Sequence, residues 1–176
     1  LASRGDQTAI IWEGDNPADS RHISYAELYK EVCKFANVLK AEGAKKGERI
    51  TIYMPMIPEA TVAMLACARI GAVHSVVFGG FAAAELAKRI DDAQPKAIIS
   101  ASCGHEPNRI VAYKPLLDEA IELSSHKPDN CVIYQREALT AGLVAGRDLE
   151  WNEAHDGAEE LAPVPVKATD PLYILY

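Results

Sequence analysis

The chain has 176 residues, and its 25 acidic and 18 basic side chains give a formal net charge of −7. That acidic balance argues against a nucleic-acid-binding surface, because phosphate binding needs clustered Lys and Arg. No apolar run is long enough to cross a bilayer. The length suits one domain with a core large enough to fold.

The cysteines and histidines show no metal-ligand spacing. The four cysteines are far apart and form no CxxC motif, and the five histidines form no HxH or HxxxH pair. We therefore propose no metal site and interpret the cysteines as small buried hydrophobic residues. Reduced thiols fit a cytoplasmic or mitochondrial-matrix location. The cysteines are Cys33, Cys67, Cys103 and Cys131.

The N-terminal part predicts a β-hairpin followed by an amphipathic helix. Residues 8–12 and 21–24 have the composition of two strands joined by a polar turn. Ser24 and Glu27 have the spacing of a capping box, and Gly43 is placed to end the helix. The apolar residues between them recur every three or four positions, as one helix face would. They are Tyr25, Leu28, Val32, Phe35 and Leu39.

From residue 49 onward, strand and helix patterns alternate. Pro58 suits the first position of a helix, and Gly71 follows its end. Strand starts roughly 25 to 35 residues apart predict βαβ units, and therefore an α/β fold with a mostly parallel sheet and helices on both faces. The predicted strands are 49–54, 73–78, 97–101 and 131–134, and the predicted helices are 58–70, 81–91 and 113–125, with a short helical turn at 151–155.

The last residues, 172–176, are all apolar or aromatic, which predicts a buried strand. Pro171 can start such a strand but could not lie in its middle. The chain also begins with Leu1 rather than Met. We therefore interpret the chain as a segment of a longer protein, with a loop following this strand.

Gly79 and Gly80 lie where a predicted parallel strand ends and a helix begins. Exposed backbone N–H groups and the helix dipole make this position a natural anion site, at the sheet edge where α/β proteins bind ligands. The alternative is a tight turn that needs positive φ angles. The chain has neither GxGxxG nor GxxxxGK[ST], so a dehydrogenase nucleotide domain or a P-loop is not supported.

Arg109 lies in the segment 103–112, expected to be a loop after the next strand. Since neighbouring loops meet at one sheet edge, Arg109 could converge with Gly79 and Gly80 on one ligand, and a guanidinium suits a phosphate. The alternative is an ordinary surface arginine. No nucleophile–base pair is apparent, and the paired carboxylates are interpreted as solvated. These pairs are Asp91 with Asp92, Asp118 with Glu122, and Asp148 with Glu150.

Several stretches together resemble the N-terminal part of AMP-forming short-chain acyl-CoA synthetases, within the adenylate-forming superfamily. The terminal strand is similar to the one that leads into the family's phosphate-binding loop. The run from Val76 to Phe81 points to the acetate and propionate branch. The resemblance covers nearly the whole chain, and its main stretches are residues 23–28, 47–59, 71–81, 100–104, 113–120 and 171–176.

The resemblance implies that residues 1–176 are a partial N-terminal domain of a ligase. Such a ligase activates propionate or acetate with ATP and Mg²⁺ to acyl-AMP, and then transfers the acyl group to CoA. The phosphate loop, the Mg²⁺ ligands and the catalytic lysine are expected outside the segment, so no catalytic residue is assigned and the isolated segment is predicted to be inactive. The expected partners are small molecules, with neither nucleic acid nor membrane, and the expected location is the cytoplasm or the mitochondrial matrix.

The resemblance also implies a CoA-binding site formed by Phe78, Gly79, Gly80 and Arg109. The first of two family arginines near the CoA 3′-phosphate is replaced here by Glu106. This departure should weaken the contact, unless the loop turns Glu106 away or Lys114 compensates. The alternative function is a non-catalytic module that binds CoA or a nucleotide.

Overall fold

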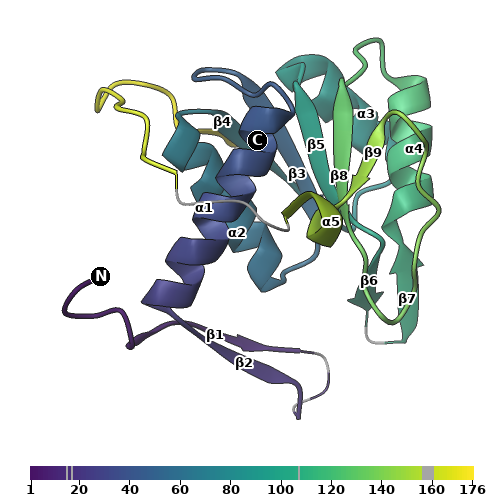
Figure 1. The fold of residues 1–176 in the computed structure, drawn as a ribbon. Coiled ribbons are helices and arrows are strands. Elements are labelled where there is room, and N and C mark those ends of the chain that lie inside the picture. Colours follow the sequence, from purple (N-terminus) through teal and green to yellow (C-terminus); the bar gives the residue numbers. More distant parts are fainter. Residues whose placement is uncertain (15, 17, 107, 156–160) are drawn as a thin grey trace.

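The computed structural model describes residues 1–14, 16, 18–106, 108–155 and 161–176. Its fold is α/β, with one parallel sheet and two small antiparallel hairpins (Figure 1). The ten strands of the described residues are β1 Thr8–Glu13, β2 Ser20–Ser24, β3 Arg49–Met54, β4 Val73–Phe78, β5 Ala97–Ala101, β6 Cys103–Glu106, β7 Arg109–Ala112, β8 Asn130–Tyr134, β9 Asp148–Glu150 and β10 Tyr173–Ile174. The helices are α1 Tyr25–Ala41, α2 Pro58–Ile70, α3 Ala83–Ala93, α4 Tyr113–Leu123 and α5 Trp151–His155.

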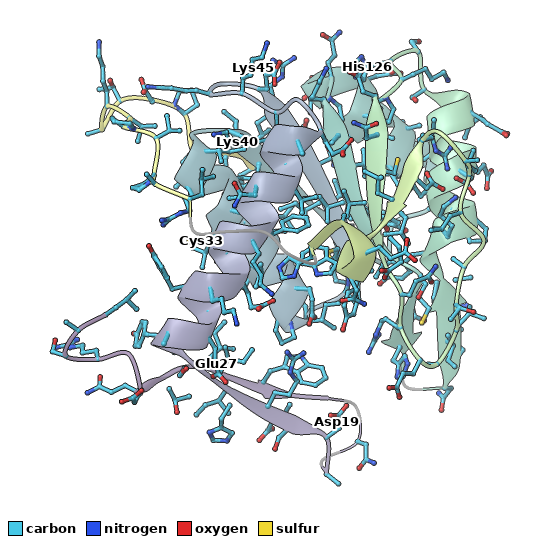
Figure 2. The ribbon with its side chains drawn as sticks, in the orientation of Figure 1. Asp19, Glu27, Cys33, Lys40, Lys45 and His126 are labelled. Carbon is cyan, nitrogen blue, oxygen red and sulfur yellow. The ribbon has the colours of Figure 1, made fainter. Side chains whose placement is uncertain are left out.

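The predicted hairpin and capping box are both confirmed. Strands β1 and β2 pair in antiparallel fashion. At the start of α1, the Ser24 Oγ accepts a hydrogen bond from the Glu27 N–H at 3.2 Å, and the Glu27 carboxylate accepts one from the Ser24 N–H at 2.8 Å. These two bonds satisfy backbone donors that a helix start leaves unpaired. Figure 2 shows Glu27, Cys33 and Lys40 along successive turns of α1.

The main sheet has six strands in the order β10-β4-β3-β5-β8-β9, and every neighbouring pair is parallel. Helices α1, α2 and α5 pack on one face, and α3 and α4 pack on the other (Figure 1). Alternation along β3 explains this arrangement, because Ile50, Ile52 and Met54 join the first core while Tyr53 joins the second. The predicted helices on both faces are therefore confirmed.

The short helix α5 is held on α1 by aromatic stacking. The rings of Trp151 and Phe35 are stacked with their centroids 3.7 Å apart, and both side chains are buried. Such a contact adds to the free energy that burial alone contributes. It accounts for the predicted helical turn at residues 151–155, which follows β9 directly.

Three sequence-based expectations need correction. The terminal strand is not buried, because β10 pairs with β4 at the edge of the sheet and leaves Tyr173 55% and Leu175 82% exposed. The segment 103–112 is not an irregular loop, because β6 and β7 form an antiparallel hairpin that begins at the Cys103–Ala112 pair. Helix α3 also starts two residues later than predicted, at Ala83.

The two ends of the parallel strands differ in what surrounds them. Lys45 and His126 lie near the top of Figure 2, where the chain approaches β3 and β8. Both hairpins lie toward the opposite end of the sheet, beyond the carboxyl ends of the strands (Figure 1). The two hairpins therefore lie near the carboxyl edge of the sheet, which is where open α/β sheets bind ligands.

Candidate functional site

The turn after β4 and the hairpin after β5 share one cavity at the carboxyl edge of the sheet. The cavity has a volume of about 360 Å³, and Gly79 and Gly80 line it together with Glu106 and Arg109. The strands β4 and β5 are not neighbours, since β3 lies between them. The loops that follow them nevertheless meet at the sheet edge, as expected, because Arg109 and the two glycines line this one cavity.

Phe78 lies on a neighbouring cavity of about 530 Å³, which Gly79, Gly80 and Glu106 also line. Its side chain is 69% exposed, and its ring meets that of Phe81 edge to face with centroids 6.0 Å apart. The four residues predicted to bind CoA thus lie around the boundary of two adjoining cavities. Cavities of this size are in the range of small-molecule sites.

Two tyrosines hold the Gly79–Gly80 turn from the side of the core. The buried Tyr53 hydroxyl lies 3.0 Å from the Phe81 carbonyl oxygen, to which it donates, and 3.3 Å from that of Gly79. Its ring stacks on that of Tyr113 with centroids 5.0 Å apart. Burial raises the pKa of Tyr53 to about 12, so its hydroxyl remains a donor at neutral pH. The sequence analysis assigned neither tyrosine to the site, although Tyr53 and Tyr113 lie in stretches that carry the family resemblance.

The glycines of the turn are required for close packing rather than for positive φ. Neither Gly79 nor Gly80 has a left-handed backbone, so the alternative interpretation of a positive-φ turn was wrong. A Cβ atom on Gly79 would lie 2.6 Å from two ring carbons of Tyr113, and one on Gly80 would lie 2.7 Å from a ring carbon of Phe78. Both distances are below van der Waals contact, so any side chain would displace the turn or the rings.

Arg109 is exposed and already paired with an acid. Its Nε donates to the Glu106 carboxylate at 2.7 Å, and the two side chains are 70% and 39% exposed. The hydrogen bond and the charge of Glu106 raise the pKa of Arg109. Glu106 and Arg109 face each other as the last pair of the β6–β7 ladder. The loop therefore does not turn Glu106 away from Arg109.

Lys114 cannot compensate for Glu106, because it is buried elsewhere. Its side chain is 3% exposed, and its Nζ lies 2.6 Å from Asp118 and 2.9 Å from Asp148. Arg147 pairs with the same two carboxylates. The prediction that Asp148 is solvated was therefore wrong, since its side chain is completely buried. Asp118 is 35% exposed and is paired with Lys114 and Arg147.

Two more cavities, of about 450 and 790 Å³, lie beside the β1–β2 hairpin. Arg21 and Glu59 line both, and they form an ion pair of 2.9 Å. None of the four residues predicted to bind CoA lines these cavities.

The cysteines behave as predicted, since all four are buried free thiols. Asp91 accepts hydrogen bonds from the Ser125 and His126 N–H groups at 2.7 and 2.9 Å, which ties α3 to the end of α4.

In the described part of the chain, no three His, Cys, Asp or Glu side chains are grouped as a metal site would require. No helix among the described residues combines the length and apolarity needed to span a membrane.

Comparisons with known proteins agree with this architecture. Among solved structures, acetoacetyl-CoA synthetase from Streptomyces lividans matches with a TM-score of 0.88 over 99% of this chain and 26% of that chain. The identity is 23%, so this match supports the fold alone. It places the parallel sheet and its helices within a larger known architecture.

Closer relatives are found by sequence. The chain is 50% identical over 174 residues to the mitochondrial acyl-CoA synthetase short-chain family member 3 of Rattus norvegicus. It is 51% identical over 178 residues to acetyl-coenzyme A synthetase of Serratia proteamaculans, and 52% identical over 173 residues to an uncharacterized protein of Pseudomonas aeruginosa. The matches cover 98%, 100% and 98% of this chain, respectively.

The chain spans about a quarter of the length of these relatives, namely 26%, 27% and 28%. The model of the family described as AMP-binding enzyme matches residues 1–176. This chain therefore belongs to the AMP-binding enzyme family.

Proposed function

We propose that the chain is part of a ligase that activates a short-chain carboxylic acid, propionate or acetate, with ATP and then transfers the acyl group to CoA. Family membership supports adenylate chemistry. Relatives named acetyl-coenzyme A synthetase and short-chain acyl-CoA synthetase, each about half identical, support the acid class and the thiol acceptor. The proposed partners are these small molecules, and the proposed location is the cytoplasm, with the mitochondrial matrix as the alternative.

The proposed reaction has two displacement steps. A carboxylate oxygen of the acid attacks the α-phosphorus of ATP, and pyrophosphate leaves. The CoA thiolate then attacks the acyl carbon, and AMP leaves. Mg²⁺ would neutralise phosphate charge in the first step, but no ligand set for it is found among the described residues. The role proposed for this segment is to bind CoA, as the resemblance of Phe78, Gly79, Gly80 and Arg109 to the family implies.

We propose the cavity between Gly79–Gly80 and Arg109 as the site of the CoA adenosine and its 3′-phosphate. Helix α3 supports an anion here, because its N-cap residue Ala82 lines the cavity and gives the helix no side-chain cap. The exposed guanidinium of Arg109 suits a phosphate. The exposed ring of Phe78 offers an apolar surface next to the two glycines. The shared cavity of the two glycines and Arg109 is the observation that carries this proposal.

Acid-dependent exchange of pyrophosphate into ATP by the full-length protein tests the proposed activity. The proposal predicts exchange with propionate or acetate, and formation of the acyl thioester once CoA is added. Exchange that no carboxylic acid stimulates would contradict it. Binding of CoA without exchange would instead support the non-catalytic module.

A further inference from the structure

Glu106 occupies the position from which it can compete with a phosphate for Arg109. Both side chains line the cavity of about 360 Å³, together with Gly79 and Gly80. Glu106 is bound to the Arg109 Nε at 2.7 Å. Among the residues that the structure describes, Arg109 forms no other hydrogen bond or ion pair through its side chain, which is 70% exposed.

The pair is electrically neutral, and this affects any anion that enters the cavity. A guanidinium alone attracts a phosphate, whereas a guanidinium beside a carboxylate offers it little net charge. Lys114 cannot restore the charge, because it is buried between Asp118 and Asp148. Arg136 lines the adjoining cavity with Glu106, and its guanidinium donates to the Cys103 carbonyl.

We infer that Glu106 is a specificity-determining residue, which competes with the 3′-phosphate of CoA for Arg109 and so reduces the preference for CoA over 3′-dephospho-CoA. This inference rests on the proposed function, because it needs CoA in this cavity. A phosphate can bind Arg109 only by displacing the Glu106 carboxylate or by lying close to it. Both displacing the carboxylate and binding close to it reduce the binding free energy of CoA, whereas 3′-dephospho-CoA, which lacks this phosphate, is not affected.

A purely structural role for the pair is the competing explanation. Glu106 and Arg109 close the β6–β7 hairpin, but three further residue pairs hold the same ladder, beginning with Cys103 and Ala112. An exposed ion pair contributes little to stability. A structural role would also act on both ligands alike, because both carry the same adenosine and pantetheine.

The test measures dissociation constants of CoA and 3′-dephospho-CoA by calorimetry on the full-length protein. The variants are Glu106→Gln, Arg109→Ala, and Glu119→Gln as a charge-matched control on an exposed position of α4. We expect Glu106→Gln to tighten CoA binding about fivefold and to leave 3′-dephospho-CoA unchanged. Glu119→Gln should change neither constant.

The Glu106→Gln and Arg109→Ala variants give different results depending on whether Glu106 competes for Arg109 and on whether CoA binds in this cavity. If Glu106→Gln leaves the ratio of the two constants unchanged while Arg109→Ala weakens CoA selectively, the inference is overturned and the CoA site stands. If Arg109→Ala leaves the ratio unchanged, the proposed placement of CoA fails, and the inference fails with it. Selective tightening in Glu106→Gln together with selective weakening in Arg109→Ala supports both.

Discussion

Tyr113 lies so close to Gly79 that a Cβ atom on the glycine would be 2.6 Å from two carbons of the tyrosine ring. The same ring would also clash with a Cβ atom on Gly104, at 2.6 Å. Tyr113 is thus held between the turn after β4 and the hairpin after β5. It connects the two segments that line the proposed CoA cavity.

Substituting Gly79 by alanine should disturb both the fold and the site. The new methyl group would overlap the Tyr113 ring, and overpacking of this kind costs about 1–3 kcal/mol. We expect a lower free energy of unfolding in urea and weaker CoA binding. Gly142→Ala is the control, because a Cβ there meets nothing within 4 Å. Equal stability of the two variants would show that the turn tolerates a side chain.

Removing the Tyr53 hydroxyl should make the Gly79–Gly80 turn less ordered. The variant Tyr53→Phe loses the hydrogen bond to the Phe81 carbonyl, which we expect to lower the free energy of unfolding by about 1 kcal/mol. CoA binding should weaken as the glycine turn becomes less ordered. Tyr25→Phe, at a tyrosine 44% exposed, is the control. The explanation is wrong if the two variants behave alike in urea unfolding and in CoA titration.

The regular elements could be predicted because their signals are local. Ser24 and Glu27 lie within one helical turn, Pro58 and Gly71 mark both ends of α2, and Gly71 has the expected left-handed φ of 72°. The strands at 49–54, 73–78 and 97–101 have the predicted boundaries, since apolar runs between turns specify buried parallel strands.

The parts that could not be predicted depend on contacts distant in sequence. Asp148 resembles a solvated acid until Lys114 and Arg147 are placed beside it. The β6–β7 hairpin was missed because its first strand carries Gly104 and charged or polar residues, which are uncommon in strands. The exposure of β10 depends on the strand order, which composition does not reveal. For the same reason, the contact of Tyr113 with Gly79 had no sequence signal.

Neutralising Asp148 should destabilise the fold strongly. Burial raises the pKa of Asp148, but hydrogen bonds from Arg147, the Val144 N–H and Lys114 outweigh it and hold the pKa below its ordinary value. Asp148→Asn leaves buried cations with one carboxylate fewer, a change that typically costs about 3–5 kcal/mol. The exposed Lys88–Glu85 pair gives the control, since Glu85→Gln should leave the free energy of unfolding nearly unchanged.

The pH dependence follows from the same shift. Folding lowers the pKa of Asp148 below its ordinary value of 3.8. Its contribution to the free energy of unfolding is therefore present above pH 3.8 and is lost as the pH falls through the pKa of the folded state. Urea unfolding from pH 7 down to pH 3 should therefore show a smaller acid loss in Asp148→Asn than in the unsubstituted protein. Parallel curves would mean that folding does not lower the pKa of Asp148.

Buried thiols should make the protein sensitive to alkali. Burial raises the pKa of Cys67 from 9.0 to about 12. The pKa of the Cys67 thiol is higher in the folded state than in the unfolded state. The contribution of this thiol to the free energy of unfolding is therefore complete below pH 9. It is lost as the pH rises toward 12, by up to about 1.4 kcal/mol per pH unit. Cys67→Ala should lose less stability than the unsubstituted protein between pH 8 and pH 10.5. Val62→Ala, a truncation in the same core without a thiol, should keep the original alkaline slope.

The most direct test of the central claim is the KM for CoA of the Arg109→Ala variant in the full-length protein. If the cavity between the Gly79–Gly80 turn and the β6–β7 hairpin holds the CoA 3′-phosphate, this KM should rise about tenfold, the loss expected for a charge-assisted hydrogen bond. The KM values for ATP and for the carboxylic acid should remain unchanged. An unchanged KM for CoA would contradict the assignment of this cavity to CoA.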